Sequence, residues 1–299
     1  MNKKINQIVN KHQKLNYIEL KNTIGSSIAK IYLNLGGSLQ ELVLNKHHII
    51  KDLSPLAYQN TYASSILFPF ANRIADGIYN FDGKDYFLDI NQAQENNALH
   101  GLVYNKTFKL VAKKTTKEEV AVLLRYEEKE YAQGFPYTYR IDLKYTLTNR
   151  SLDLSVSVKN TDSKTFLFTI GWHPYFNTSD LYNSIVRFKS NKQVYFDERN
   201  ITQGIKEFKI NDEFEIENKS LDDCFVLDSN NILFETPDYN FELISSEKDC
   251  FLQLYTPPKA NTIAIEPTTG VSNSFNNKIG LKTLKPNDTY NINWKLKLN

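Results

Sequence analysis

The sequence predicts an all-β protein, a large antiparallel β-sandwich with few short helices. Three observations support this. Apolar and polar residues alternate with a period of two along many segments, Tyr and Phe are abundant at 18 each, and helical periodicity is weak throughout. Aromatic side chains pack well on a pleated sheet, and repeated strands without alternating helices are typical of a sandwich or barrel.

Two hairpins follow from turn residues between alternating runs. The segment 78-IYNFDGKDYFL-88 contains Asp82-Gly83, a pair suited to a type I′ turn. The runs 141–147 and 152–158 alternate on either side of a polar Asn-Arg-Ser break. Each pair of runs predicts two antiparallel strands joined by a tight turn.

The remaining pattern predicts one domain over residues 1–299. The segment 290-YNINWKLKL-298 alternates strictly, which predicts a half-buried strand at the end of the chain. The only helical candidates are short pieces within 54-SPLAYQNTYASS-65. No internal repeat, Gly/Ser-rich linker or low-complexity tract marks a domain boundary.

Composition excludes several classes of partner. Lys and Arg total 36 against 34 Asp and Glu, and the two signs are interspersed, so we expect no nucleic acid and no membrane surface as partner. The two cysteines, Cys224 and Cys250, predict neither a zinc site nor a disulfide framework. There is no apolar run of roughly 18 residues and no apolar leader segment, which predicts a cytoplasmic protein.

Four stretches place polar side chains among apolar residues. These are 68-FPFANRIADG-77, 97-NALHGL-102, 169-TIGWHPYFN-177 and 263-IAIEPTTGVSN-273. Taken singly, each has a structural explanation: a histidine in an apolar strand is more often a core residue than a catalyst, and Arg73 could be an ordinary ion-pair partner. Glu266 is harder to explain in this way, because a carboxylate between Ile265 and Pro267 is costly to bury unless it is paired.

Taken together, the four stretches predict proton transfer on a neutral polar ligand. Glu266 supplies a carboxylate whose pKa burial can raise, and His173 supplies an acid that titrates near neutrality. Arg73 and His100 add donors for ring or hydroxyl oxygens. We expect each of these side chains to stand at the end of a strand.

Competing motifs are missing from the sequence. It contains no G-x-S-x-G, no P-loop and no G-x-G-x-x-G. The adjacent pair His47-His48 does not predict a metal site, because consecutive strand residues point to opposite faces. His12 lies in a charged N-terminal stretch and is expected to be solvated.

A series of motifs in the order of a known family carries a resemblance to that family. They include an Asn-Arg-Ile segment, an Asp-Gly hairpin and a Leu-His-Gly motif within 72-NRIADGIYNFDGKDYFLDINQAQENNALHG-101, and His173 before a Tyr-Phe pair. They continue with 221-LDDCFVL-227, the strand 252-LQLYTP-257 and Glu266. From about residue 20 to the C-terminus, the sequence resembles the aldose 1-epimerase family of galactose mutarotase-like proteins.

The resemblance implies a galactose mutarotase-like supersandwich that binds a free sugar in a cleft and interconverts its α and β anomers. It implies that Glu266 is the general base for the C1 hydroxyl and that His173 is the general acid for the ring oxygen. It implies substrate-binding roles for a further set of residues, with no metal and no organic cofactor. These residues are His100, Arg73, Asn72, Asp222 and Gln253.

Departures from the family pattern leave the sugar undefined. Trp172 and Pro174 flank the histidine where a common family form has Asn and a small residue, and 267-PTTGVSN-273 replaces a Pro-Asp-Ala type of sequence. Asp223 stands beside Asp222, and motif position favours Asp222 as the ligand-facing residue. The partner is expected to be a small-molecule sugar and the protein a monomer.

Two alternatives remain within the same fold. A hexose-6-phosphate 1-epimerase needs a cluster of Arg or Lys for the phosphate. Near the motifs the sequence offers Arg73 and few others, which are Lys106, Lys109, Arg125 and Arg140. A non-catalytic sugar-binding protein would be favoured had His173 or Glu266 been lost, and both are present.

Overall fold

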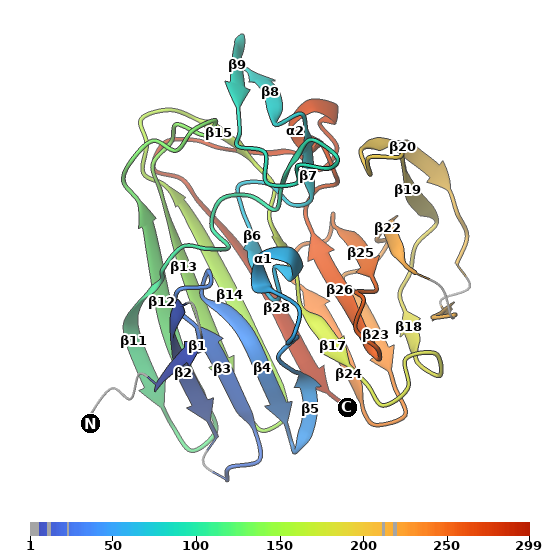
Figure 1. Ribbon diagram of the computed structural model, residues 1–299. Helices are drawn as coiled ribbons and strands as arrows, with labels where there is room; N and C mark the ends of the chain where they lie inside the picture. The colour runs from blue at the N-terminus through green and yellow to red at the C-terminus, as the bar shows by residue number, and fades with distance from the viewer. Residues whose placement is uncertain (1–5, 11–12, 23, 211–212, 218–219) are drawn as a thin grey trace.

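The computed structural model describes residues 6–10, 13–22, 24–210, 213–217 and 220–299. His12 lies outside the described residues. The described chain is built from antiparallel strands with two four-residue helices (Figure 1). No helix in these ranges is long and apolar enough to span a bilayer.

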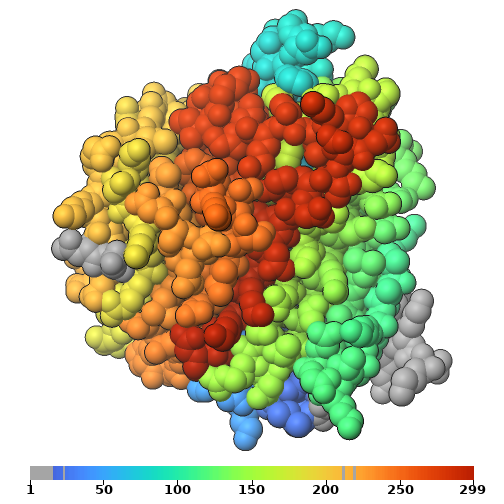
Figure 2. All heavy atoms as spheres, turned by 180° about the vertical axis from the view of Figure 1, so that it is seen from behind, coloured from blue at the N-terminus to red at the C-terminus, as the bar shows by residue number. Residues whose placement is uncertain are grey.

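The largest sheet has nine strands and forms one layer of the molecule. In spatial order they are β11 (Lys109–Thr115), β12 (Val120–Glu128), β13 (Tyr139–Leu147), β14 (Ser151–Asn160), β28 (Thr289–Leu298), β24 (Asn240–Ser245), β23 (Asn231–Glu235), β18 (Ile185–Arg187) and β21 (Glu213–Glu215). Figure 2 shows its outer side, with β28 in red between β14 in yellow-green and β24 in orange. The predicted hairpin over 141–158 is confirmed by the β13–β14 pairing, and the predicted final strand by β28.

Two further sheets stand side by side against the nine-stranded one. The first, of five strands, consists of β1 (Asn6–Asn10), β2 (Gln13–Lys21), β3 (Ile28–Tyr32), β4 (Ser38–Leu44) and β5 (His47–Ile50). The second, of eight strands, runs through β20 (Thr202–Glu207), β19 (Lys192–Phe196), β22 (Asp222–Val226), β25 (Phe251–Tyr255), β26 (Thr262–Thr268), β16 (Gly171–Trp172) and β6 (Ile66–Leu67), and its eighth strand, β17 (Tyr175–Asn177), also pairs with β26. In Figure 1, β3 and β4 lie on one side of α1 (Tyr58–Thr61), and β25 and β26 lie on the other.

Short elements close the edges of these layers. Three two-stranded sheets pair β7 (Arg73–Ala75) with β10 (Asn97–Leu99), β8 (Ile78–Phe81) with β9 (Lys84–Phe87), and β15 (Phe166–Phe168) with β27 (Lys282–Leu284). The second helix is α2 (Ser274–Asn277). The predicted Asp-Gly hairpin is confirmed by β8–β9, where Asp82 and Gly83 have φ of 52° and 69°. A type I′ turn requires positive φ at both positions.

One apolar core joins the layers. Trp172 of the eight-stranded sheet stacks on Trp294 of β28 with ring centroids 6.2 Å apart. Phe176 of β17 packs on Phe241 of β24 at 4.6 Å, and the Tyr145 hydroxyl of β13 donates to the carbonyl of Gly37. These contacts confirm the predicted antiparallel sandwich, because sheets that face each other bury the apolar sides of their strands between them.

Candidate active site

The site residues predicted from sequence lie around one pocket of about 150 Å³. It is bordered by the eight-stranded sheet, by the β7–β10 pair and by the C-terminal end of α1. The predicted residues that line it are Asn72, Arg73, His100, His173, Asp222, Gln253 and Glu266.

Three of these side chains come from one face of the eight-stranded sheet. Gln253 of β25 stands directly opposite Glu266 of β26, and Cys224 of β22 stands opposite Gln253 on the other side. Because alternate strand residues share a face, Asp222 lies on the same face as Cys224. Gln253 Nε2 donates to Asp222 Oδ1 over 2.6 Å.

The same alternation decides between the two adjacent aspartates. Asp223 points to the opposite face of β22, where its Oδ1 accepts a hydrogen bond from Gln193 at 2.9 Å. Asp222 lines the pocket and Asp223 does not. Of the two aspartates, Asp222 is therefore the one that reaches the pocket.

His173 lies between β16 and β17 and is held by its backbone. Its N–H donates to the carbonyl of Ser65 at 3.1 Å, and its own carbonyl accepts from the N–H of Ser64 at 2.7 Å. Its ring stacks on Tyr175 at 4.9 Å and meets the edge of His100 at 5.0 Å. In this setting the imidazole lies with its Nε2 3.4 Å from Glu266 Oε1.

Arg73 and His100 are brought together by the β7–β10 pair, in which Leu99 stands opposite Arg73. The residues next to this pair, Asn72 and His100, both have positive φ, of 59° and 61°. The His100 N–H donates to the Asn72 carbonyl at 2.9 Å, which ties the two together. Positive φ is uncommon for residues other than glycine, and such strain concentrates at ligand-binding positions.

The Arg73 guanidinium is aimed by two neutral amides. Its Nε donates to Gln92 Oε1 at 3.1 Å, and its Nη1 donates to Asn72 Oδ1 at 2.9 Å. An arginine has five N–H donors. In the described part of the chain the others have no hydrogen-bond partner, so they are available to oxygens of a ligand.

Burial shifts both members of the His173–Glu266 pair toward their neutral forms. Only 4% of His173 and 3% of Glu266 is exposed. Burial raises the pKa of Glu266 well above its usual value, and the nearby Asp222 carboxylate adds to the rise. Burial lowers the pKa of His173 to about 3. A carboxylic acid beside a neutral imidazole holds one proton, the same number as a carboxylate beside an imidazolium.

The pKa values of two further residues in the pocket, His100 and Asp222, are also shifted. Burial, followed by repulsion from His173 and Arg73, lowers the pKa of His100 well below its usual value. Burial raises the pKa of Asp222, against the opposing effect of the Arg73 charge. Clustered groups with perturbed pKa values in a cleft mark a candidate functional site.

One detail of the sequence prediction is corrected. Glu266 is the fifth residue of the seven in β26, so it lies inside a strand and not at its end. At this central position Glu266 has Gln253 of β25 on one side and His173, between β16 and β17, on the other. Arg73 begins β7, and His100 follows β10, as expected.

Sequence reasoning missed other residues that line the pocket. They are Asn60, Thr61, Tyr62, Gln92, Leu99, Tyr175 and Tyr255. Tyr255 had a usable signal, because it lies two residues after Gln253 in a strand and so shares its face. Gln92 and Tyr62 come from loops and had none.

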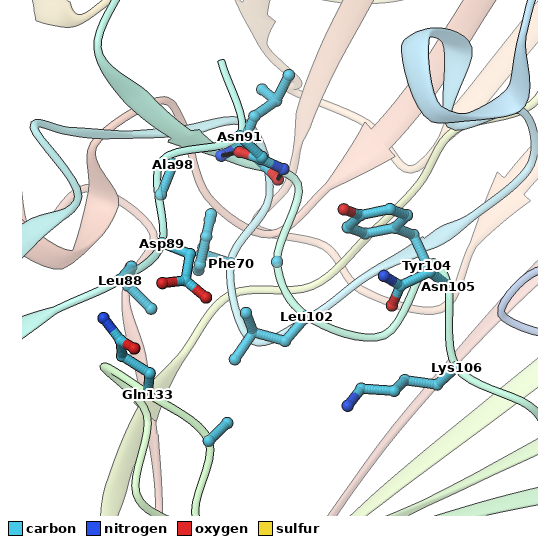
Figure 3. A pocket seen from close by; sticks show the side chains of 13 residues that line it. Phe70, Leu88, Asp89, Asn91, Ala98, Leu102, Tyr104, Asn105, Lys106 and Gln133 are labelled. Atoms are coloured by element: carbon cyan, nitrogen blue, oxygen red, sulfur yellow. Dashed lines mark hydrogen bonds between the residues drawn. The ribbon is translucent and has the colours of Figure 1, made fainter. Parts of the chain in front are cut away.

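The other basic residues considered from sequence lie elsewhere. Lys106 lines an adjoining pocket of about 230 Å³, which shares Leu99 with the first and is shown in Figure 3. Its ammonium is 3.4 Å from Glu128. Arg125 and Arg140 both pair with Asp142. Arg73 is the one Lys or Arg among the residues that line the pocket around His173.

This arrangement can move protons on an uncharged polyol. A buried acid–base pair stands at the pocket wall, with amide, carboxylate and guanidinium groups around it. Hydrogen bonds from such groups suit hydroxyl oxygens and hydroxyl protons. Gln253 Oε1, 5% exposed as a residue, has no partner among the described residues and is free to accept one.

Comparison with known proteins agrees with this description. The family profile described as aldose 1-epimerase matches residues 17–297. The uncharacterized protein YihR of Escherichia coli K12 is 23% identical over 274 residues, which cover 85% of this chain and 84% of YihR.

Solved structures show the same fold. A galactose mutarotase-like protein from Clostridium acetobutylicum superposes with a TM-score of 0.82 at 22% identity, covering 99% of this chain and 98% of that one. A galactose 1-epimerase from Lactobacillus acidophilus NCFM gives 0.81 at 18% identity, covering 100% and 99%. The predicted galactose mutarotase-like fold is confirmed, and the match to the family profile over nearly the whole length shows that this chain belongs to the aldose 1-epimerase family.

Proposed function

We propose that this protein interconverts the α and β anomers of a free aldose such as galactose or glucose. The observation that carries the proposal is the buried contact of 3.4 Å between His173 Nε2 and Glu266 Oε1 in a polar pocket. Family membership supports the same reaction class.

In the proposed reaction Glu266 takes the proton of the C1 hydroxyl while His173 gives a proton to the ring oxygen. The C1–O5 bond breaks, and the open aldehyde rotates about C1–C2. Reclosure on the other face of the carbonyl gives the opposite anomer, with the two side chains exchanging roles. Each well-placed acid or base contributes typically 10²–10⁴-fold.

The reaction requires that the pair hold one proton when the sugar enters. Burial favours the neutral distribution, in which the proton is on Glu266. Sugar hydroxyls and the Arg73 guanidinium restore polar contacts around the carboxylate, which favours transfer of that proton to His173 Nε2. Because only protons move between sugar and side chains, the proposed reaction uses no metal and no organic cofactor.

The charges around the pocket favour an uncharged aldose. Two carboxylates, Asp222 and Glu266, and a single guanidinium, Arg73, line it. A dianionic phosphate is bound by clustered Arg or Lys, and Lys106, Arg125 and Arg140 are paired with acidic residues away from the pocket. A hexose 6-phosphate is therefore a poorer fit than a free sugar.

The test is anomer exchange on freshly dissolved α-galactose and α-glucose, followed by polarimetry. Wild type is expected to accelerate equilibration, and Glu266→Gln and His173→Asn are expected to fall close to the spontaneous rate. The proposal is wrong if wild type leaves both free sugars at the spontaneous rate. Acceleration of glucose 6-phosphate alone would then identify a phosphate epimerase, and sugar binding without acceleration would identify a binding protein.

A further inference from the structure

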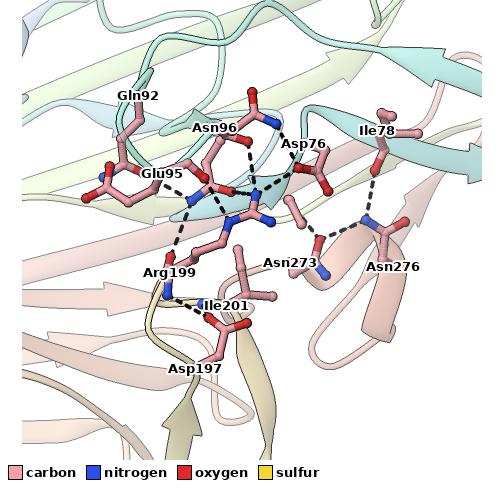
Figure 4. A network of polar contacts seen from close by, with 12 residues as sticks. Asp76, Ile78, Gln92, Glu95, Asn96, Asp197, Arg199, Ile201, Asn273 and Asn276 are labelled. Atoms are coloured by element: carbon pink, nitrogen blue, oxygen red, sulfur yellow. Dashed lines mark hydrogen bonds and ion pairs between the residues drawn. The ribbon is translucent and has the colours of Figure 1, made fainter.

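Arg199 stands at the centre of a polar network beside the pocket, on the loop between β19 and β20 (Figure 4). Asp197 shapes this loop, because its Oδ1 accepts from the N–H groups of Arg199 and Ile201, both at 2.9 Å. The Asn200 carbonyl accepts from the Ser272 hydroxyl at 2.8 Å. These hydrogen bonds hold the loop in place without any contribution from the Arg199 side chain.

The Arg199 guanidinium reaches across to the β7–β10 pair. It donates to four acceptors. Three belong to consecutive residues that lead into β10, and the fourth belongs to the residue that follows β7. These acceptors are the carbonyls of Glu95 and Asn96, Asn97 Oδ1 and Asp76 Oδ1, at 2.8, 3.1, 3.0 and 2.9 Å. No residue that lines the pocket is among them.

A chain of amides leads from Arg199 to Arg73. Asn97 is fully buried, and its Nδ2 donates to Gln92 Oε1 at 3.4 Å and to the Arg199 carbonyl at 3.3 Å. The backbones of Gln92 and Asn97 exchange two hydrogen bonds of 3.1 Å. Gln92 Oε1 in turn accepts from Arg73 Nε.

We propose that Arg199 is a positioning residue that fixes Gln92 through Asn97 and so sets the direction of the Arg73 guanidinium in the pocket. The consequence for substrate binding rests on the function proposed above. The planar fork of an arginine can hold several acceptors at once, whereas a lysine is a single point of charge. Arg199→Lys therefore keeps the positive charge beside Asp76 but loses the set of hydrogen bonds that the guanidinium makes to Glu95, Asn96 and Asn97.

The ion pair with Asp76 contributes little to this role. The Arg199 side chain is 33% exposed and that of Asp76 is 47% exposed, and ion pairs at such positions add little to stability. Arg199→Lys is therefore expected to fold. A matched control is Arg187→Lys, because Arg187, on β18 of the nine-stranded sheet, is likewise a partly exposed arginine in ion pairs, here with Glu213 and Glu235.

The first measurement needs no activity. In a ¹⁵N NMR spectrum the Arg73 Nε–H signal, assigned with Arg73→Lys, is expected to shift and to exchange faster with water in Arg199→Lys. The same signal is expected to be unchanged in Arg187→Lys. An Arg73 signal that is the same in wild type and Arg199→Lys overturns the proposal, whether or not the protein is a mutarotase.

The second measurement is steady-state anomer exchange. Arg199→Lys is expected to raise KM about tenfold and to change kcat by less than about threefold, since loss of binding made equally in ground and transition states appears in KM. Partial unfolding would instead lower kcat alone, and that result contradicts the proposal.

Coupling between the two arginines completes the test. In the Arg73→Lys background, Arg199→Lys is expected to have almost no further effect on KM, because residues in one network are not additive. If the two KM effects multiply, Arg199 does not act through Arg73. If wild type shows no anomer exchange, the proposed function fails, while the NMR result still decides the role of Arg199.

Discussion

Strands β14 and β26 both run through the interior of a sheet, but they bury different chemistry. Along β14 the residues Leu152, Leu154, Val156 and Val158 are buried, and the polar residues between them are partly exposed. All seven residues of β26 are buried, and one of them is Glu266. One strand follows the alternation of a half-buried sheet, and the other departs from it.

The region around β14 stabilises the fold, whereas the region around β26 lowers the stability of the fold. From Leu152 to Val158 every buried residue of β14 is apolar, and the backbone hydrogen bonds of the strand are completed by β13 and β28. Beside β26, the Nδ1 atoms of His100 and His173 and Gln253 Oε1 have no hydrogen-bond partner within the described ranges. Buried polar groups without partners are costly. This is the cost in stability that we expect of a pocket that serves the proposed ligand.

The largest predicted effect concerns the acid–base pair. Glu266→Gln and His173→Asn are each expected to lower kcat by about 10²–10⁴-fold. The double variant is expected to be no slower than the slower single variant, because the two side chains act as one unit. The measurement is kcat for anomer exchange in all four proteins, and losses that multiply would mean that the two residues act independently.

The second prediction concerns the other strand. Leu154→Ala is expected to lower the free energy of unfolding by about 2–5 kcal/mol, because it leaves a cavity in a fully buried position. Activity per folded molecule is expected to be unchanged. Urea unfolding and active-site titration check both parts. Loss of kcat without loss of stability would show that the two regions are not separable.

The third prediction concerns pH. The pair keeps one proton from about pH 3, the lowered pKa of His173, up to the raised pKa of Glu266. After subtraction of the spontaneous rate, kcat/KM is expected to change by less than about twofold between pH 5.5 and 7.5. Independent groups with the ordinary pKa values of 4.5 for Glu and 6.5 for His would give a rate that falls about tenfold per pH unit above pH 7. Such a fall would contradict the shifts in pKa.

The smallest predicted effect is a gain in stability. The pKa of Glu266 is higher in the folded than in the unfolded protein, so the unfolded state releases this proton first as the pH rises above 4.5, and stability is lost. Glu266→Gln removes this loss, and we expect a gain of about 0.5–2 kcal/mol at pH 8. The gain should shrink toward pH 5.

The control for this gain is Glu118→Gln, at an exposed position in the turn between β11 and β12. Thermal unfolding of both variants at the two pH values provides the comparison. An equal change in stability in both variants, or a loss of stability in Glu266→Gln, would mean that burial of Glu266 does not destabilise the folded protein.

Local sequence patterns were sufficient for the parts of the fold that depend on neighbours in the chain. The β13–β14 hairpin follows from alternating Leu, Val and Tyr, and the β8–β9 turn follows from Asp82-Gly83. The pairing of β26 with β16 and β17 joins residues about 90 positions apart, and nothing in the alternation specifies it.

At the site, the sequence pattern identified the residues with unusual chemistry but not the residues that support them. Glu266 and His173 stand out because charged or titratable groups are rare in apolar strands. The resemblance to the family supplied their expected roles. Arg199 could not be found, because it bonds mainly to backbone carbonyls and amides, and any sequence can provide a carbonyl. Its partner Asp76 is 123 residues away.

The central claim is that Glu266 does chemistry and does not merely hold the sugar. The most direct test measures galactose binding by calorimetry and anomer exchange by NMR on the same sample of Glu266→Gln. Our account predicts that binding stays within about fivefold of wild type, since a neutral Gln resembles the protonated acid, while exchange falls to the spontaneous rate. Exchange near the wild-type rate with intact binding would contradict it.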